Sequence, residues 1–217
     1  MRRLAALLLL CCALPASAQN LPDLPGLDDF LPEPTRYLAG YINAQYGKAT
    51  PFGSHWGDKG SGFATSGAFS LSASKRVDEI LSYGGEVYYA PGHVSRQHEG
   101  LEAGVMGLYP FLRASFPSGN KTWYGILGAG VYQWTAPAYT LGGTRFGSQS
   151  ASSAGVNLGL GVNVPFWWGT RAGVDLRWHH VFNMNGTSLD LGSVDTYNVM
   201  FSVQYNLWRE RAKPATP

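Results

Sequence analysis

Apolar and polar positions alternate along most of the chain after residue 36, in segments of about ten residues. The clearest segment is Ser153–Val164, where every even position is apolar and the odd positions are Ser, Gly or Asn. Arg171–Phe182 and Tyr197–Leu207 alternate in the same way. Because successive side chains of a strand point to opposite faces, these segments predict strands with one apolar face and one small or polar face.

Earlier segments fit the same pattern less sharply, and together with the three clear ones they make eight strands. The connections alternate between long ones, at 47–62, 91–99, 135–152 and 183–195, and short ones at 74–79, 115–121 and 165–170. The sequence therefore predicts an all-β fold, an antiparallel eight-stranded transmembrane β-barrel with its long loops on the outer side. The earlier segments are Tyr37–Tyr46, Phe63–Ala73, Ile80–Ala90, Leu101–Ala114 and Thr122–Trp134, and the phase of the last one stays open.

A soluble β-sandwich or lipocalin-like barrel also has alternating strands, because alternation alone does not say which face meets water. Here the polar face uses Gly, Ser, Asn and Ala, which suit the cramped interior of a narrow barrel. Charged residues make up only 14% of the chain, against roughly 25% in ordinary soluble domains. Aromatic residues gather near the strand ends, as membrane interfaces favour. These three observations favour the membrane barrel.

The first 36 residues do not show this pattern. Arg2 and Arg3, an apolar stretch from Leu4 to Leu14 and the small residues 16–18 predict a secretory signal peptide over 1–18. Residues 19–36 contain four prolines and predict an irregular periplasmic leader, which places the barrel at 37–208 and a tail at 209–217. Without residues 1–18 the chain has 14 basic and 14 acidic residues and no cysteine, so nothing in its charge indicates nucleic acid.

The last predicted strand resembles the C-terminal strand by which the outer-membrane assembly machinery recognises its clients. The whole segment after Arg36 is similar to the outer membrane protein beta-barrel family of OmpA, OmpX and OmpW type. This resemblance implies the bacterial outer membrane as the location, general secretion as the route, and lipid, lipopolysaccharide and the assembly machinery as partners. The residues that carry the assembly signal are Tyr197, Val199, Phe201, Val203, Tyr205, Leu207 and Trp208.

Ionisable residues also fall on the predicted inner face of the barrel. The clear phase of Arg171–Phe182 places three of them there, and the less certain phases of two earlier strands add two more. Charges enclosed in a narrow lumen must pair, since an unpaired buried charge is costly. We therefore expect a salt-bridged interior that closes the barrel rather than a proton or ion path. The five residues are Glu86, Glu102, Asp175, Arg177 and His179.

Part of the same strand resembles the signature of PagL-type lipid A deacylases. Arg177, His180 and Asn183 match that signature, and Asp195 stands where the family has an acidic partner. The resemblance implies acyl hydrolysis at His180. The nucleophile position, however, is Phe182, and His with an acid can only activate a hydroxyl that another residue supplies. Ser188 lies in the following loop, where its spacing does not place it beside His180.

Three histidines, His55, His93 and His98, lie in the first two long loops, but no acidic or cysteine cluster completes a metal site around them. We expect neither a metal nor a cofactor. The leading hypothesis is a non-enzymatic outer-membrane barrel whose external loops make surface contacts or which supports the envelope. Two alternatives stay open: a lipid A or phospholipid acyl hydrolase that uses His180, and a narrow channel or binder for small hydrophobic molecules.

Overall fold

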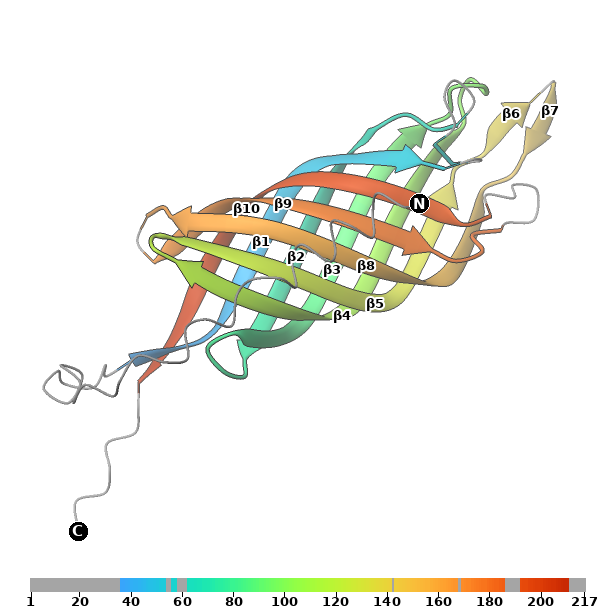
Figure 1. Ribbon diagram of the computed structural model, residues 1–217. Coiled ribbons are helices and arrows are strands. Elements are labelled where there is room, and N and C mark those ends of the chain that lie inside the picture. The colour runs from blue at the N-terminus through green and yellow to red at the C-terminus, as the bar shows by residue number, and fades with distance from the viewer. Residues whose placement is uncertain are drawn as a thin grey trace, which may run out of the picture. The chain divides into compact units, whose positions relative to one another are not determined.

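Eight long strands close into one antiparallel barrel (Figure 1). The computed structural model describes residues 36–53, 56–57, 62–141, 143–167, 169–185 and 192–210, so the predicted signal peptide and most of the leader and tail lie outside the described residues. The strands are β1 (Arg36–Phe52), β2 (Ser66–Arg76), β3 (Leu81–Val94), β4 (Glu102–Ser118), β5 (Lys121–Ala136), β6 (Tyr139–Leu141), β7 (Thr144–Phe146), β8 (Gln149–Pro165), β9 (Thr170–Val181) and β10 (Val194–Glu210).

The barrel closes where β1 pairs with β10, from Arg36 opposite Glu210 to Phe52 opposite Asp195. All other neighbours follow the order of the chain, except that β5 pairs with β8. The exception arises because β6 and β7 form a hairpin of their own inside the long connection, and this hairpin projects from one end of the barrel (Figure 1). Closure leaves no unpaired sheet edge, as a strand structure in lipid requires. The predicted eight-stranded antiparallel fold is confirmed.

The outer surface of the barrel is apolar over a band that lysines delimit. On β9, Val174 and Leu176 point outward and are 48% and 56% exposed, while Asp175 between them points into the lumen. Lys75 lies opposite Gly40 at one end of β1, and the exposed Lys48 follows eight positions further along that strand. A tilted strand crosses the hydrocarbon core in about 9–11 residues. The spacing of the two lysines, eight positions, comes close to this length.

The strands are longer than the alternation predicted. β1 continues to Phe52 instead of ending at Tyr46, because backbone pairing goes on beyond the apolar band. The predicted start of the second strand at Phe63 is wrong, since β2 begins at Ser66 and Phe63 forms only an isolated bridge with Ser95. The predicted loop 135–152 contains the β6–β7 hairpin. Hydrophobic alternation thus marks the membrane band, not the full length of the strands.

Small residues inside the barrel make room for large ones on neighbouring strands. Gly161 of β8 pairs with Tyr124 of β5, and a Cβ added at Gly161 would overlap the Tyr124 ring. Gly125, the next residue of β5, has no atom nearer than 3.7 Å to such a Cβ. The glycines on the inner face are therefore needed for packing, because a close-packed interior has no space for an added methyl group.

The short turn between β2 and β3 is closed by Asp78. The backbone amides of Ile80 and Leu81 donate to Oδ1 of this carboxylate, at 2.7 and 2.6 Å. These two hydrogen bonds, from Leu81 first and Ile80 second, lower the pKa of Asp78 below its ordinary value of 3.8. Such an Asx-type turn is a common way to reverse a chain between two strands.

Candidate functional site

The lumen of the barrel contains a network of buried charges centred on Arg177. Its Nη1 lies 3.1 and 3.0 Å from the two carboxylate oxygens of Glu86, and its Nη2 lies 3.2 Å from Oδ2 of Asp175. The side chains are at most 2% exposed. Tyr109 donates to Glu86 at 2.6 Å, while Tyr124 and Gln45 donate to Asp175 at 3.1 and 2.7 Å. One guanidinium thus faces two carboxylates, and neutral donors satisfy much of the excess negative charge.

His179 lies next to this network, in a layer of tyrosines. Its Nδ1 is 2.9 Å from the hydroxyl of Tyr132, and its ring stacks on Tyr88 with 4.5 Å between centroids. The Tyr109 ring lies 5.9 Å from it, between the charges and the aromatic layer. His179 and the three tyrosines around it are at most 2% exposed, so this layer is buried inside the barrel.

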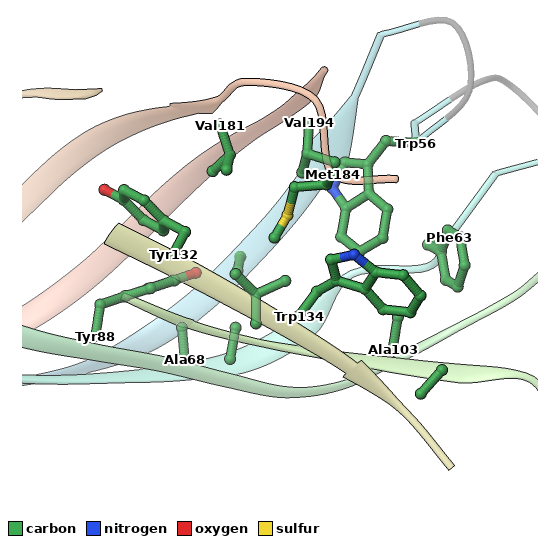
Figure 2. Close-up of a cluster of buried hydrophobic side chains, with 14 of the residues drawn as sticks. Trp56, Phe63, Ala68, Tyr88, Ala103, Tyr132, Trp134, Val181, Met184 and Val194 are labelled. Carbon is green, nitrogen blue, oxygen red and sulfur yellow. The ribbon is translucent and has the colours of Figure 1, made fainter. Parts of the chain in front are cut away.

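An apolar cap, which we define as Trp56, Phe63, Trp134, Met184 and Val194, covers the end of the lumen toward the long loops (Figure 2). Trp56 and Met184 come from the loops after β1 and β9, and both are fully buried. Figure 2 shows the two Trp rings next to Met184, with Tyr88 and Tyr132 to their left. Buried charges, aromatic rings and the apolar cap therefore all lie inside the barrel.

Glu102 does not join the network, contrary to the prediction. It is exposed at the start of β4, whose odd positions are the buried ones: Ala103, Val105, Tyr109 and Phe111. The phase was misread because both faces of β4 carry large apolar residues, with Leu108 and Leu112 outward. When both faces of a strand are apolar, the sequence pattern does not distinguish the face toward the lumen from the face toward lipid. The other four predicted lumen residues are brought together.

His180 and Asp195 meet on the outside of the barrel. His180 Nδ1 is 2.8 Å from Asp195 Oδ1, and the indole nitrogen of Trp178 donates to the same oxygen at 3.0 Å. Phe182 lies edge-on to His180 with 4.6 Å between ring centroids. Arg177 points to the other side, into the lumen, and Ser188 lies outside the described residues. The pair has an acid and a base, but a phenyl ring occupies the position beside the imidazole.

Of the remaining histidines, His93 has a structural role. His93 is fully buried under the cap, with Nδ1 3.0 Å from the carbonyl oxygen of Ala64 and its ring 5.0 Å from that of Trp56. His98 lies in the loop after β3, and His55 is outside the described residues. In the described part of the chain, no three His, Cys, Asp or Glu side chains come together in a way that could hold a metal ion.

Six of the seven assembly-signal residues predicted on the last strand lie on its outward face, whereas Trp208, which directly follows Leu207, falls on the inward phase and lines a cavity at the end of the barrel. The exposed fractions of the seven residues on β10 range from 37% for Leu207 to 57% for Phe201. Between them, Asn198, Met200, Ser202 and Gln204 are buried. The outward face of β10 is therefore continuous with the apolar band, and whether the assembly machinery reads it stays a prediction.

No family model and no curated protein matches the sequence. Solved structures do match. Neisserial surface protein A is 15% identical, with a TM-score of 0.53 over 77% of this chain and 97% of that protein. The attachment invasion locus protein Ail of Yersinia pestis and a major outer membrane protein of Thermus thermophilus are each 14% identical with a TM-score of 0.47. They are covered over their whole length, against 77% and 78% of this chain.

The chain has the fold of the small outer-membrane β-barrels. In this barrel, sequence reasoning found the charged members of the network but missed their neutral partners, Gln45, Tyr109 and Tyr124. These three come from β1, β4 and β5, and only the closed register brings them beside β9. A small signal existed for Tyr124, since its place opposite Gly161 pairs a large side chain with a small one.

Among the described residues, no helix is long and apolar enough to cross a membrane.

Proposed function

We propose that the protein is an integral outer-membrane β-barrel without enzymatic activity, which is closed along its axis and acts through its outer loops or as a support of the envelope. The outward apolar band is the observation that carries this proposal. Leu108, Leu127 and Leu160, on three consecutive barrel strands, are 62%, 58% and 55% exposed on the outer surface. Exposing so many large apolar side chains to water is unfavourable, whereas lipid accepts them.

The filled lumen supports a scaffold rather than a channel. An eight-stranded barrel has an interior just wide enough for side chains. Here the Arg177 network, the tyrosine layer and the apolar cap follow one another across that interior. Continuous water, which ion conduction requires, has no path through layers of fully buried aromatic rings. We therefore expect no open-pore current.

The His180–Asp195 pair gives acyl hydrolysis a specific observation in its favour, since the pair faces outward where a lipid would approach. The reaction needs a nucleophile within hydrogen-bond reach of the imidazole. The neighbour on the same face is Phe182, which has no hydroxyl. Hydrolysis therefore stays the second candidate, and we interpret the pair as an interfacial hydrogen bond that orients Trp178 through Asp195.

Fractionation and conductance test the proposal together. We expect the full chain, expressed in a Gram-negative host, to partition into the outer membrane and to migrate faster in a detergent gel when unheated than when boiled. Refolded wild-type protein in planar bilayers should give no unitary current. The Arg177→Ala variant, which removes the central side chain of the charge network from the lumen, is measured alongside it as the control. A freely soluble periplasmic product, or regular wild-type current steps, would contradict the proposal.

A further inference from the structure

A chamber of about 320 Å³ lies at the end of the barrel opposite the apolar cap. Its walls come from the inner faces of several strands and from the short turns, and Leu38, Ile80 and Trp208 lie among the lining residues. Among the described side chains that line the chamber are three arginines, Arg76, Arg113 and Arg171, and one carboxylate, that of the exposed Glu79. Its lining therefore carries an excess of positive charge.

Arg113 carries the deepest of these charges and is 2% exposed. Its guanidinium carbon lies 4.4 Å from the ring centroid of Tyr41 and 3.7 Å from that of Tyr124. Nη1 donates to the side-chain oxygen of Gln204 at 2.9 Å, and Nε donates to the hydroxyl of Ser115 at 3.2 Å. All four partners are neutral. They orient the guanidinium and stabilise it by cation–π contact, but none of them supplies a negative charge.

Arg171 also lines the chamber, and its partners among the described residues are all neutral. Its Nε donates to the side-chain oxygen of Asn163 at 3.1 Å. Its Nη2 reaches the hydroxyl of Thr122 at 3.0 Å and the backbone oxygens of Asn163 and Asn120 at 3.2 and 3.3 Å. Neutral hydrogen-bonding groups thus hold both arginines in place at one cavity. Because these groups carry no net charge, the positive charge of each guanidinium is not neutralised and can attract an anionic ligand.

The carboxylates of the lumen do not neutralise these arginines. Asp175 lies beyond the Tyr124 ring and is engaged by Arg177. In the described part of the chain, no carboxylate lies within ion-pair distance of Arg113 or Arg171. The hydroxyl of Tyr41, which also lines the chamber, is buried and has no hydrogen-bond partner among the described residues. A buried cation without a counter-charge is costly, and so is a buried hydroxyl that makes no hydrogen bond.

We infer that the chamber binds an oxyanion, the phosphate or carboxylate group of a small molecule, between Arg113 and Arg171. Planar guanidinium groups bind such groups through paired charge-assisted hydrogen bonds, and the Tyr41 hydroxyl is placed to add a further donor. Leu38, Ile80 and Trp208, the apolar side chains of the lining, offer contacts to a non-polar part of the same ligand. If the protein has the orientation that the proposed function gives it, the chamber opens to the periplasm, but binding itself does not depend on that orientation.

Titration calorimetry with inorganic phosphate, and separately with acetate, tests the inference on the refolded full chain in a neutral maltoside detergent. We expect saturable heat with at least one of the two anions, and at least a tenfold weaker affinity for Arg171→Gln and for Arg113→Gln. Arg96→Gln, which removes an exposed arginine from the loop after β3, is the matched control and should bind like the wild type. Heat-modifiable gel migration checks that each variant is folded, and the partly exposed Arg171 keeps the test valid if Arg113→Gln does not fold.

A second arm distinguishes the source of the anion. In phosphatidylcholine nanodiscs, loss of the phosphate heat seen in detergent would show that a lipid headgroup fills the chamber, whereas retained heat would show a site for a soluble molecule. The inference is overturned if neither anion gives saturable heat in detergent, or if Arg171→Gln and Arg96→Gln weaken binding equally. Failure of membrane insertion in cells would overturn the proposed function and leave this result unchanged.

Discussion

Removing Arg177 should destabilise the barrel more than removing either acid that it contacts. In Arg177→Met the carboxylates of Glu86 and Asp175, whose side chains are 2% and 0% exposed, lose their only cation in the network. Breaking a buried pair in this way costs about 3–5 kcal/mol of unfolding free energy, because the remaining charges stay uncompensated. Glu86→Gln instead leaves Arg177 and Asp175 as a balanced pair and removes charge-assisted hydrogen bonds worth about 1.5–3 kcal/mol.

Urea unfolding from lipid vesicles, followed by tryptophan fluorescence, measures these free energies by linear extrapolation. Glu102→Gln is the matched control, because it makes the same chemical change on the exposed start of β4 and should shift the free energy by less than about 0.5 kcal/mol. We expect the losses to follow the order Arg177→Met, Glu86→Gln, Glu102→Gln. Equal losses for Arg177→Met and Glu86→Gln would refute the reasoning, since they would show that the two-to-one charge balance has no energetic consequence.

Three further predictions follow from the packing, the turn and the outer pair. Gly161→Ala should cost about 1–3 kcal/mol in the same unfolding assay, since overpacking strains a filled interior, while Gly125→Ala should be nearly neutral. Asp78 should titrate below its ordinary pKa of 3.8 in a carbon-detected NMR titration; its contribution to stability is present above that value and is lost as the pH falls through the lowered pKa, and a normal midpoint would contradict the turn geometry. Purified protein incubated with lipid A should release no fatty acid by mass spectrometry, and release that disappears in His180→Ala would instead establish the hydrolase.

The strands of the second half of the barrel could be predicted because their two faces differ in kind. On β8 and β10, the lumen side carries mostly Gly, Asn, Ser and Gln, and the lipid side carries aliphatic or aromatic residues. On β4 and β5, the lumen side is itself aromatic, with Tyr109 and Tyr132 buried there. On such strands, alternation does not show whether the odd or the even positions face the lumen. Only the packing of the folded barrel decides this.

A single phase error on β4 had two consequences. It placed Glu102 in the lumen, and it gave no reason to look for Arg113 there, although Arg113 is 2% exposed inside the barrel. The charge of Arg113 would have been the signal, because lipid does not accept an unpaired guanidinium, so the inward phase of β4 follows. The apolar cap was missed for a different reason: Trp56 and Met184 come from loops, where no periodicity predicts which side chains turn inward.

The orientation of the two faces toward lipid is the central claim, and spin labels on single cysteines test it most directly. With Cys11 and Cys12 replaced by Ser, nitroxide labels are placed at Leu176→Cys on the outer face of β9 and at Asn157→Cys on the inner face of β8. In vesicles, we predict that the label at 176 collides more often with oxygen, which concentrates in lipid, than with a water-soluble nickel chelate, and that the label at 157 meets neither. Higher collision rates with the nickel chelate at 176 would show that the apolar band faces water, and would contradict the account.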